Sequence, residues 1–326
     1  MSLDFDALTL TDIIRLQDEL SQTIKRRFEK NLALAFSDIV GSTPYFERFG
    51  NEAGEGMRRR HSDLVQEALL QFGGRLVDTA GDGAFTCFPQ AVNAVEAYKA
   101  FQLQVSESNA SRAREHHLMA RVGIHFGPVL TDGVIVSGDP VNLCSRVAGT
   151  AAPGEIRLTK EAFLDLPPGM RLSCRKTPQV SLKGISRPVD ILIIDWRDAS
   201  VFPVAVMIEQ MQLKLPLPQQ DLITFGRLSE LNGVKANDIA LLLDDPLLAQ
   251  QISRWHFELR RHRDGMTLRS VTDAMTEVNG QAVAKGQEVP VRPGSLVVLS
   301  RVLTLRFIGD ERVPGAEHDR TLGVGG

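Results

Sequence analysis

The sequence predicts an α+β domain followed by an all-β sandwich. Apolar residues up to about residue 197 switch between helical and strand spacing in the order strand, helix, hairpin, helix, strand, helix. A proline-containing stretch at 198–220 then interrupts the pattern. After it the apolar period is two with no long helix, which is typical of a β-sandwich. We expect the first part to be a sheet with its helices on one face.

Composition supports two domains and excludes several classes of protein. The chain has 326 residues, about two domains at roughly 150 residues each. Its formal net charge of −3 gives no basic excess for nucleic acid and no polybasic membrane patch. Three cysteines are too few for a disulfide framework, and no apolar run is long enough to span a membrane. We therefore expect a cytoplasmic protein without a nucleic-acid or membrane partner.

Residues 1–30 contain a predicted helix over 8–30. Its apolar residues recur at spacings of three and four and form one stripe: Ile13, Leu16, Leu20, Ile24 and Phe28. Two interpretations are open. The stripe packs on the helix's own domain, or it pairs two chains in a short parallel coiled coil.

The predicted first domain covers residues 31–197. Its expected strands are 32–36, 75–79, 83–88 and 120–126. Its expected helices are 57–72, 91–105 and a third one that begins at Asp139-Pro140, where Asp139 would be the N-cap. Gly73-Gly74 is a helix stop signal.

The predicted second domain covers residues 221–309, after a linker at 198–220. Its expected strands are 223–225, 255–259, 295–299 and 303–307, separated by turn residues. Residues 310–326 are expected to be a loose tail.

Two carboxylates stand out in the first domain. Asp38 ends an apolar strand, and Asp82 lies in the turn of a hairpin, each near glycine residues that allow a ligand close approach. Mg²⁺ takes one or two carboxylates and fills its other positions with water and phosphate oxygens. An aspartate in a glycine-rich turn is also a common turn residue, so this pair alone does not identify a metal site.

Further polar residues suit a nucleotide. Asn142 and Arg146 are four apart on the predicted third helix and share one face. An asparagine amide can bind a sugar oxygen and an arginine fork can bind phosphate oxygens. Arg121 on a strand and Lys183 in a loop are two more cations that could bind phosphate. Together these residues suit a triphosphate.

The segment from Asn31 to about Trp196 resembles the class III nucleotide cyclases, the adenylate and guanylate cyclase family. Six pieces match in order and spacing: 36–43 (FSDIVGST), 78–85 (DTAGDGAF), 121–125 (RVGIH), 141–146 (VNLCSR), 152–156 (APGEI) and 182–184 (LKG). The resemblance implies a ferredoxin-like α+β fold. It also implies an enzyme that converts a nucleoside triphosphate to a 3′,5′-cyclic nucleotide and pyrophosphate.

The same resemblance implies a role for each matching residue. Asp38 and Asp82, with the Ile39 carbonyl, would hold two Mg²⁺ or Mn²⁺ ions per active site. Asn142 and Arg146 would be catalytic, and Arg121 and Lys183 would bind the triphosphate. The resemblance also implies a homodimer with its active sites at the interface between the two chains. One chain would contribute the metal-binding residues, and the other would contribute Asn142 and Arg146.

Two positions bear on the choice of nucleobase. In the family, a lysine precedes the Thr-x-Gly-Asp segment in ATP-using enzymes and a glutamate in GTP-using ones; here that residue is Asp78. A carboxylate can accept hydrogen bonds from the N1–H and 2-amino groups of guanine, whereas adenine N1 is itself an acceptor. The second selecting position, Ile135, can hydrogen-bond neither base. GTP is favoured; adenylate cyclase and a catalytically weak signalling scaffold are the alternatives.

Residues 221–309 resemble a forkhead-associated (FHA) domain. The matching pieces are Gly226-Arg227, 237–239 (NDI), 253–256 (SRWH) and 278–280 (VNG). The resemblance implies that Arg227 and Ser253, with Arg254 nearby, bind the phosphate of a phosphothreonine protein. Asp273 and Ala274 replace the Thr-Asn pair usual in the family, so phosphate-independent docking is the alternative.

Overall fold

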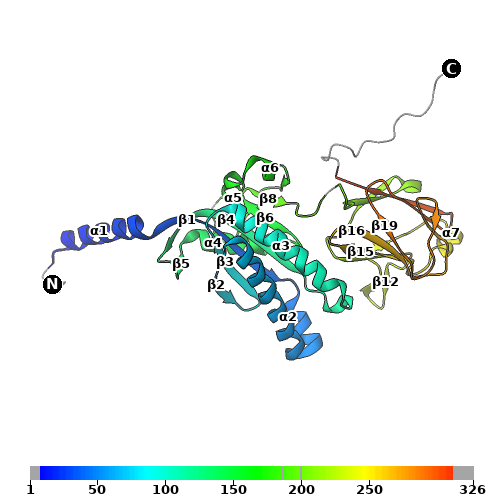
Figure 1. The fold of residues 1–326 in the computed structure, drawn as a ribbon, viewed down its shortest axis with the longest axis horizontal. Helices are drawn as coiled ribbons and strands as arrows, with labels where there is room; N and C mark the ends of the chain where they lie inside the picture. Colours follow the sequence, from blue (N-terminus) through cyan, green and yellow to red (C-terminus); the bar gives the residue numbers. More distant parts are fainter. Residues whose placement is uncertain (1–7, 186, 199, 311–326) are drawn as a thin grey trace, which may run out of the picture. The chain divides into compact units, whose positions relative to one another are not determined.

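The computed structural model describes residues 8–185, 187–198 and 200–310. The chain divides into two compact units (Figure 1). Unit 1 comprises residues 1–102 and 120–194, and unit 2 comprises 103–119 and 195–326. Residues 1–7 and 311–326 lie outside the described ranges, so most of the expected tail is not described.

Unit 1 is built on one mixed sheet with the strand order β2-β3-β1-β4-β6-β8-β7, and β5 pairs with β4. Strand β1 is antiparallel to both β3 and β4, whereas β4 and β6 are parallel. The strands are β1 (Glu29–Ile39), β2 (Arg75–Ala80), β3 (Gly83–Phe88), β4 (Ala120–Thr131), β5 (Val136–Ser137), β6 (Ile156–Thr159), β7 (Cys174–Lys176) and β8 (Ile191–Ile194). The α+β fold class is confirmed.

The helices of unit 1 are α1 (Leu10–Phe28), α2 (Ser42–Phe72), α3 (Ala91–Ala110, shared with unit 2), α4 (Asp139–Thr150), α5 (Lys160–Asp165) and α6 (Pro168–Arg171). Helix α2 is longer than predicted and bends at Gly50, whose φ of 82° is not helical. It ends as predicted: Gly73 has a φ of 66° and the N–H of Gly74 reaches the Leu69 carbonyl. Helix α4 has Gly138 as its N-cap, so Asp139 is its first residue rather than its cap.

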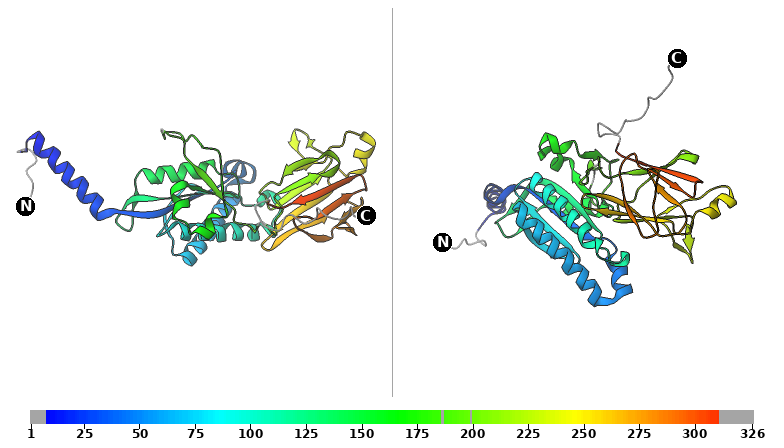
Figure 2. Two further views of the ribbon diagram at one scale, coloured as in Figure 1. Left: turned by 90° about the horizontal axis from the view of Figure 1, so that it is seen from above. Right: turned by 45° about the vertical axis from the view of Figure 1, so that its right-hand side comes forward.

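Helices cover both faces of the sheet, which corrects the expectation of one covered face. Thr86 hydrogen-bonds Tyr98 of α3 on one face, where α2 and α3 run side by side (Figure 2). The Cys144 thiol of α4 donates to the Leu34 carbonyl, and both residues share a core cluster on the opposite face. The physical reason lies in β1, where Ala33, Leu34 and Ala35 are all buried. Because successive residues point to opposite faces, both faces of the strand are apolar and each must be covered by helices.

Helix α1 is amphipathic and buries no residue. Thr9 caps it, and the side chains of Thr9 and Asp12 bond each other's backbone N–H groups. Most of its stripe is exposed, Leu20 by 56% and Ile24 by 43%, whereas Leu16 and Phe28 are half-buried. Within the described residues, most of the stripe is therefore not packed on its own domain.

Unit 2 is a sandwich of two sheets, with strand orders β10-β9-β21-β20-β17-β18 and β14-β11-β15-β16-β19. A hairpin, β12 (Glu230–Leu231) and β13 (Val234–Lys235), and helix α7 (Pro246–Gln251) complete it. The first sheet contains β9 (Ala205–Ile208), β10 (Leu213–Pro216), β17 (Thr276–Val278), β18 (Gln281–Ala282), β20 (Leu296–Leu299) and β21 (Leu303–Ile308). The second contains β11 (Leu222–Gly226), β14 (Ile239–Ala240), β15 (Phe257–His262), β16 (Gly265–Ser270) and β19 (Glu288–Val291). The predicted sandwich is confirmed.

Part of the expected linker is strand. Strands β9 and β10 lie within 198–220, and β9 pairs with β21. The prolines wrongly indicated a linker throughout 198–220. Pro216 ends β10, which is an edge strand, and an edge strand tolerates proline because its missing N–H breaks no hydrogen bond of the ladder. Ala205, Val206 and Ile208 are buried, so this segment belongs to the sandwich core.

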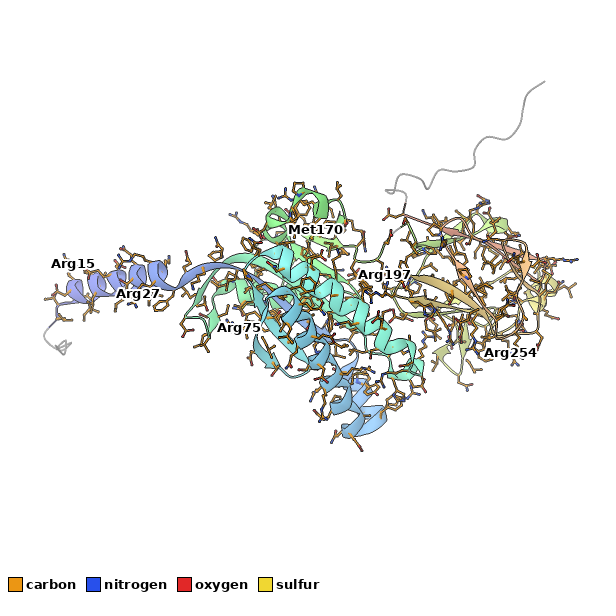
Figure 3. The ribbon with its side chains drawn as sticks, viewed as in Figure 1. Arg15, Arg27, Arg75, Met170, Arg197 and Arg254 are labelled. Carbon is orange, nitrogen blue, oxygen red and sulfur yellow. The ribbon has the colours of Figure 1, made fainter. Side chains whose placement is uncertain are left out.

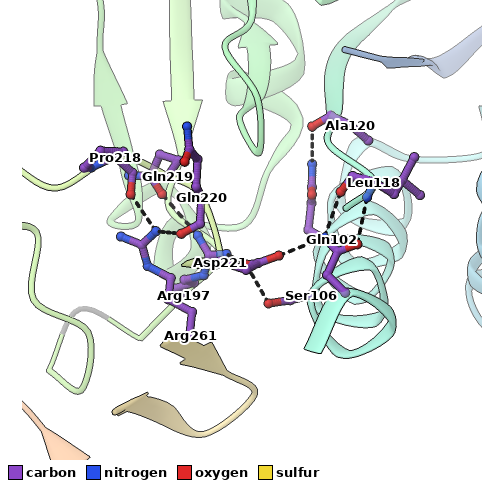
Figure 4. A network of polar contacts seen from close by, with 11 residues as sticks. Gln102, Ser106, Leu118, Ala120, Arg197, Pro218, Gln219, Gln220, Asp221 and Arg261 are labelled. Atoms are coloured by element: carbon purple, nitrogen blue, oxygen red, sulfur yellow. Dashed lines mark hydrogen bonds and ion pairs between the residues drawn. The ribbon is translucent and has the colours of Figure 1, made fainter. Parts of the chain in front are cut away.

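Residues 103–119, the end of α3 and the loop after it, pack within unit 2 around the buried Asp221 (Figure 4). The Asp221 carboxylate accepts hydrogen bonds from Ser106 Oγ at 2.7 Å, Asn109 Nδ2 at 3.0 Å and Arg197 Nη2 at 3.0 Å. Nearby, the buried Arg261 guanidinium donates to the carbonyls of Pro218 and Gln220. Burial lowers the pKa of Arg197 to about 10 and that of Arg261 to about 9.

Candidate functional site

Asp38 and Asp82 come from the same end of two neighbouring strands. Ser37 of β1 is paired with Ala84 of β3, so Asp38 is one residue beyond the last pair. Asp82 lies in the two-residue turn between β2 and β3, whose other member, Gly81, has a φ of 63°. Both carboxylates are partly exposed. Strand register thus brings the two predicted metal ligands to one end of the sheet.

Arg121 joins this group from the other side of β1. It is the cross-strand partner of Asp38 in the β1–β4 ladder. Its Nε and Nη2 atoms donate to Asp38 Oδ2 at 2.9 and 2.5 Å, and Nη1 donates to the Gly149 carbonyl at 3.1 Å. One cation therefore lies beside the carboxylate and the end of α4.

The donor set at this end of the sheet fits magnesium bound together with a nucleotide. No group of three His, Cys, Asp or Glu side chains that could hold a metal occurs in the part of the chain that the structure describes. Two carboxylates are enough for Mg²⁺ when phosphate oxygens and water supply the other ligands. Ile39, the third predicted ligand, is the last residue of β1 and its side chain is buried.

Helix α4 carries Asn142 and Arg146. It packs closely on β4, because a Cβ at Gly123 would stand only 2.2 Å from the Ala148 nitrogen. The Asn142 side chain is exposed. The Arg146 guanidinium lies against Gly184, where a Cβ would be 3.2 Å from Nη1. Arg146 and the loop of Lys183 are thus brought together, and Lys183 itself is exposed.

Asp78 owes its direction to a β-bulge. Between Leu76 and Asp78 the β2–β3 register shifts, so Val77 is an extra residue. Asp78 is therefore opposite Phe85, which faces the core cluster containing Cys144 of α4. Asp78 is exposed, and its Oδ1 accepts a hydrogen bond from the Thr79 N–H. The bulge puts Asp78 on the same face of the sheet as α4.

Ile135 lies in the turn between β4 and β5 and is 62% exposed. Its N–H and that of Val134 both donate to Asp132 Oδ1 at 2.9 Å. These two backbone hydrogen bonds are the main reason why the pKa of Asp132 is lowered. The Val134 carbonyl accepts a 2.8 Å hydrogen bond from Arg75 of β2. Sequence reasoning missed Arg75 and Asp132, although Asp132-Gly133 is a turn signal.

In unit 2 the three predicted phosphate-binding residues lie on two adjoining loops. A Cβ at Gly226 would be 2.1 Å from the Arg254 carbonyl oxygen, so only glycine allows these loops to touch. The Arg227 N–H donates to the Ser253 carbonyl at 3.0 Å. The side chains of Arg227 and Arg254 are exposed (Figure 3 labels Arg254).

Ser253 contacts Thr272, the residue before Asp273. Its hydroxyl is 2.7 Å from the Thr272 hydroxyl, a neighbour that sequence reasoning missed. Asp273 is bound to the Lys285 ammonium at 2.9 Å. A carboxylate near a bound phosphate would repel it, and the Lys285 counter-charge offsets part of that repulsion. Ala274 still has no side-chain amide that could bind a peptide.

His256 supports the same loop from the core. Its Nδ1 accepts the Ser253 N–H at 3.2 Å, and its Nε2 is 3.2 Å from Thr276 Oγ1. Since Nδ1 accepts, the neutral ring carries its proton on Nε2. Burial lowers the pKa of His256 to about 4.

The fold and these two sites define a class of protein. Its α+β domain has carboxylates at the strand ends and cations that could bind a nucleotide, and its β-sandwich has two adjoining loops that carry arginines. Comparison with known families makes this specific. The family model described as "Adenylate and Guanylate cyclase catalytic domain" matches residues 24–194, just over half of the chain. The FHA domain model matches residues 223–300. The chain belongs to the adenylate and guanylate cyclase family and carries an FHA domain.

The chain is also similar to individual bacterial proteins. A Rhizobium meliloti protein provisionally named adenylate cyclase 3 is 25% identical over 58% of this chain and 32% of its own length. An adenylate cyclase of Streptomyces coelicolor is 34% identical over 42% of this chain and 34% of its own. The solved adenylyl cyclase CyaB from P. aeruginosa is 26% identical, with a TM-score of 0.46, over 51% of this chain and 94% of that one.

The chain spans about a third of the length of these two curated relatives. In the described part of the chain, no helix combines the length and the apolar character needed to cross a membrane.

Proposed function

We propose that the protein is a nucleotide cyclase that forms a 3′,5′-cyclic nucleotide and pyrophosphate from a nucleoside triphosphate. The observation that carries this is the pair Asp38 and Asp82 at one end of adjacent strands, with Arg121 beside Asp38. Family membership supports it.

In the proposed reaction the ribose 3′-hydroxyl attacks the α-phosphorus and pyrophosphate leaves. Asp38, Asp82 and the Ile39 carbonyl would hold two Mg²⁺ or Mn²⁺ ions, which when bound would lower the pKa of the hydroxyl and offset charge on the leaving group. Arg121 and Lys183 would bind the triphosphate, and Arg146 would stabilise charge on the equatorial oxygens in the transition state. Asn142 would orient the ribose.

We propose that the active site forms between two copies of the chain. Asp38 and Asp82 of one subunit would act with Asn142 and Arg146 of the partner subunit. The exposed side chain of Asn142 and the exposed apolar stripe of α1 support this arrangement. In this dimer the α1 helices of the two chains would pair along their stripes.

Mixing two inactive variants tests the shared site. Asp38→Ala and Arg146→Ala should each be inactive alone. A mixed dimer would have one intact site, so an equilibrated equimolar mixture should recover about a quarter of wild-type activity. A mixture of Asp38→Ala with Asp82→Ala is the matched control and should stay inactive. No recovery in the first mixture would contradict the shared site.

For the nucleobase, we favour GTP because the Asp78 carboxylate faces the α4 side of the sheet and suits the guanine N1–H and 2-amino group. The names of the relatives favour ATP as the second candidate. Purified protein with Mn²⁺ and either GTP or ATP separates the two. A higher kcat/KM for ATP would overturn the choice, and no cyclic product from either would favour a signalling scaffold.

For unit 2, we propose binding of a phosphothreonine protein through Arg227, Ser253 and Arg254. An arginine fork beside a hydroxyl suits a phosphate dianion. Arg227→Ala should weaken binding of a phosphothreonine peptide library at least about tenfold. Arg263→Ala, in the turn at the other end of β15, is the matched control. If the wild-type protein binds no phosphorylated peptide, docking without phosphate becomes the better interpretation.

A further inference from the structure

The two positions proposed to select the base lie on different elements. Asp78 is in β2, and Ile135 is in the β4–β5 turn. Arg75, which is labelled in Figure 3, connects them. It is three residues before Asp78, and its Nη1 donates to the carbonyl of Val134, the residue before Ile135, at 2.8 Å. We infer that Arg75 is a positioning residue that sets the Ile135 turn relative to Asp78 and so affects base discrimination, an inference that rests on the proposed cyclase function.

The bulge at Val77 places Arg75 and Asp78 on the same face. In a regular strand, residues three apart point to opposite faces. Here Arg75 is opposite Cys87 and Asp78 is opposite Phe85, two residues apart on β3. Cross-strand partners share a face, so both side chains lie on the α4 side of the sheet.

The two central residues of the turn are exposed. Val134 is 73% exposed and Ile135 62% exposed, so neither is packed in the core. Their N–H groups are both bound by Asp132 within the turn itself. The turn continues into β5, where Val136 pairs with Thr131 of β4. Among the described residues, the Arg75 hydrogen bond joins this turn directly to the strand of Asp78, and the buried Val136 that follows the turn belongs to the core cluster against which Val77 of β2 packs.

The charges around Arg75 favour this position of its guanidinium. Asp132 is a nearby carboxylate whose pKa Arg75 helps to lower, after the effect of the two backbone hydrogen bonds. Burial raises the pKa of the Cys87 thiol, and the positive charge of Arg75 opposes that rise. The Arg75 side chain therefore reaches from its position opposite Cys87 to the carbonyl of Val134 in the turn.

The test compares Arg75→Met, which keeps much of the volume but cannot donate, with Arg75→Lys, which keeps a charged donor. The measurement is kcat and KM of the full chain with GTP and with ATP. Arg75→Met should change the GTP-to-ATP ratio of kcat/KM by about tenfold, mainly through KM. Arg75→Lys should recover part of the change. An unchanged ratio in Arg75→Met would overturn the inference.

Arg171→Met is the matched control, because Arg171 also donates to backbone carbonyls of unit 1, those of Leu164 and Leu166, but outside the proposed site. It should leave the ratio unchanged. An equal change of the ratio in both variants would mean that Arg75 acts only through general stability.

Amide hydrogen exchange tests the positioning role of Arg75 separately from the proposed cyclase activity. Exchange at residues 132–136 should be faster in Arg75→Met than in wild type, and unchanged in Arg171→Met, whether or not the protein turns over nucleotide. Equal exchange in wild type and Arg75→Met would overturn the positioning role. Absence of any cyclic product from wild type would instead refute the proposed function. If Arg75→Met does not fold, Arg75→Lys is tested by the same two measurements, with smaller changes in the same direction.

Discussion

Arg121 and Asp38 are cross-strand partners, and two nitrogens of the Arg121 guanidinium donate to a single oxygen of the Asp38 carboxylate. Both side chains are about 30% exposed. A pair with this exposure contributes little to stability, of the order of 1 kcal/mol at most. The pair matters for the proposed function, because it holds the Arg121 cation beside Asp38, a proposed metal ligand.

Asp38→Asn should separate activity from stability. We expect cyclic nucleotide formation to fall by at least about 100-fold, because the amide is a poor ligand for a hard cation and a poor counter-charge for Arg121. The thermal unfolding midpoint should move by only a few degrees. Asp63→Asn, an exposed carboxylate on α2, should keep activity. Activity retained in Asp38→Asn would refute the metal-binding role.

Gly123→Ala should disturb α4 and the residues it carries. The new Cβ would lie 2.2 Å from the Ala148 nitrogen, so helix and strand must move apart. We expect a loss of about 1–3 kcal/mol in the free energy of unfolding, measured by urea titration with far-UV circular dichroism, together with lower turnover. Gly149→Ala adds the same methyl group where nothing lies within 4 Å and should preserve both. An unchanged Gly123→Ala would contradict the close contact.

Asp221→Asn should weaken unit 2. The substitution keeps the shape but leaves the buried Arg197 without its counter-charge. Loss of one partner of a buried pair costs about 3 kcal/mol or more. Both tryptophans, Trp196 and Trp255, belong to unit 2, so tryptophan fluorescence reports the unfolding of that unit. The exposed Asp244→Asn is the control, and equal midpoints for the two variants would contradict the role of Asp221.

Acid should destabilise unit 2 through His256. Its pKa is about 4 in the folded protein and about 6.5 in an unfolded chain. Between these values the unfolded state binds more protons, so the free energy of unfolding falls as pH falls from about 6.5 to 4, by about 3 kcal/mol in total. Above pH 6.5 this contribution is fully present.

The measurement is urea unfolding by tryptophan fluorescence at pH 7.5 and 4.5. His256→Gln should be less stable at pH 7.5, because it loses buried hydrogen bonds, but should change less between the two pH values. His262→Gln, at an exposed histidine that ends β15, should keep the wild-type pH dependence. The same dependence in His256→Gln would show that another group is responsible.

Much of the fold follows from local sequence signals. The apolar run before Asp38 predicted β1, Gly73-Gly74 marked the end of α2, and alternating residues predicted β11 and β21. These signals depend on residues that are neighbours in the chain, so they can be interpreted without the fold. The candidate residues Asp38, Asp82, Asn142, Arg146 and Arg227 were likewise found from motifs and their spacing.

Contacts between distant residues required the tertiary structure. Arg75 meets Val134 across 59 positions, and Ser106 meets Asp221 across 115. Neither pair has a local signal, because each forms only after the intervening chain has folded. The bulge at Val77 is a property of two paired strands, so β2 alone could not predict the face on which Asp78 lies. Local sequence signals alone predicted the two folds and supplied the residues proposed for the candidate sites. The tertiary structure decided which side chains hold those sites in place, because strand register and loop closure are set by the whole chain.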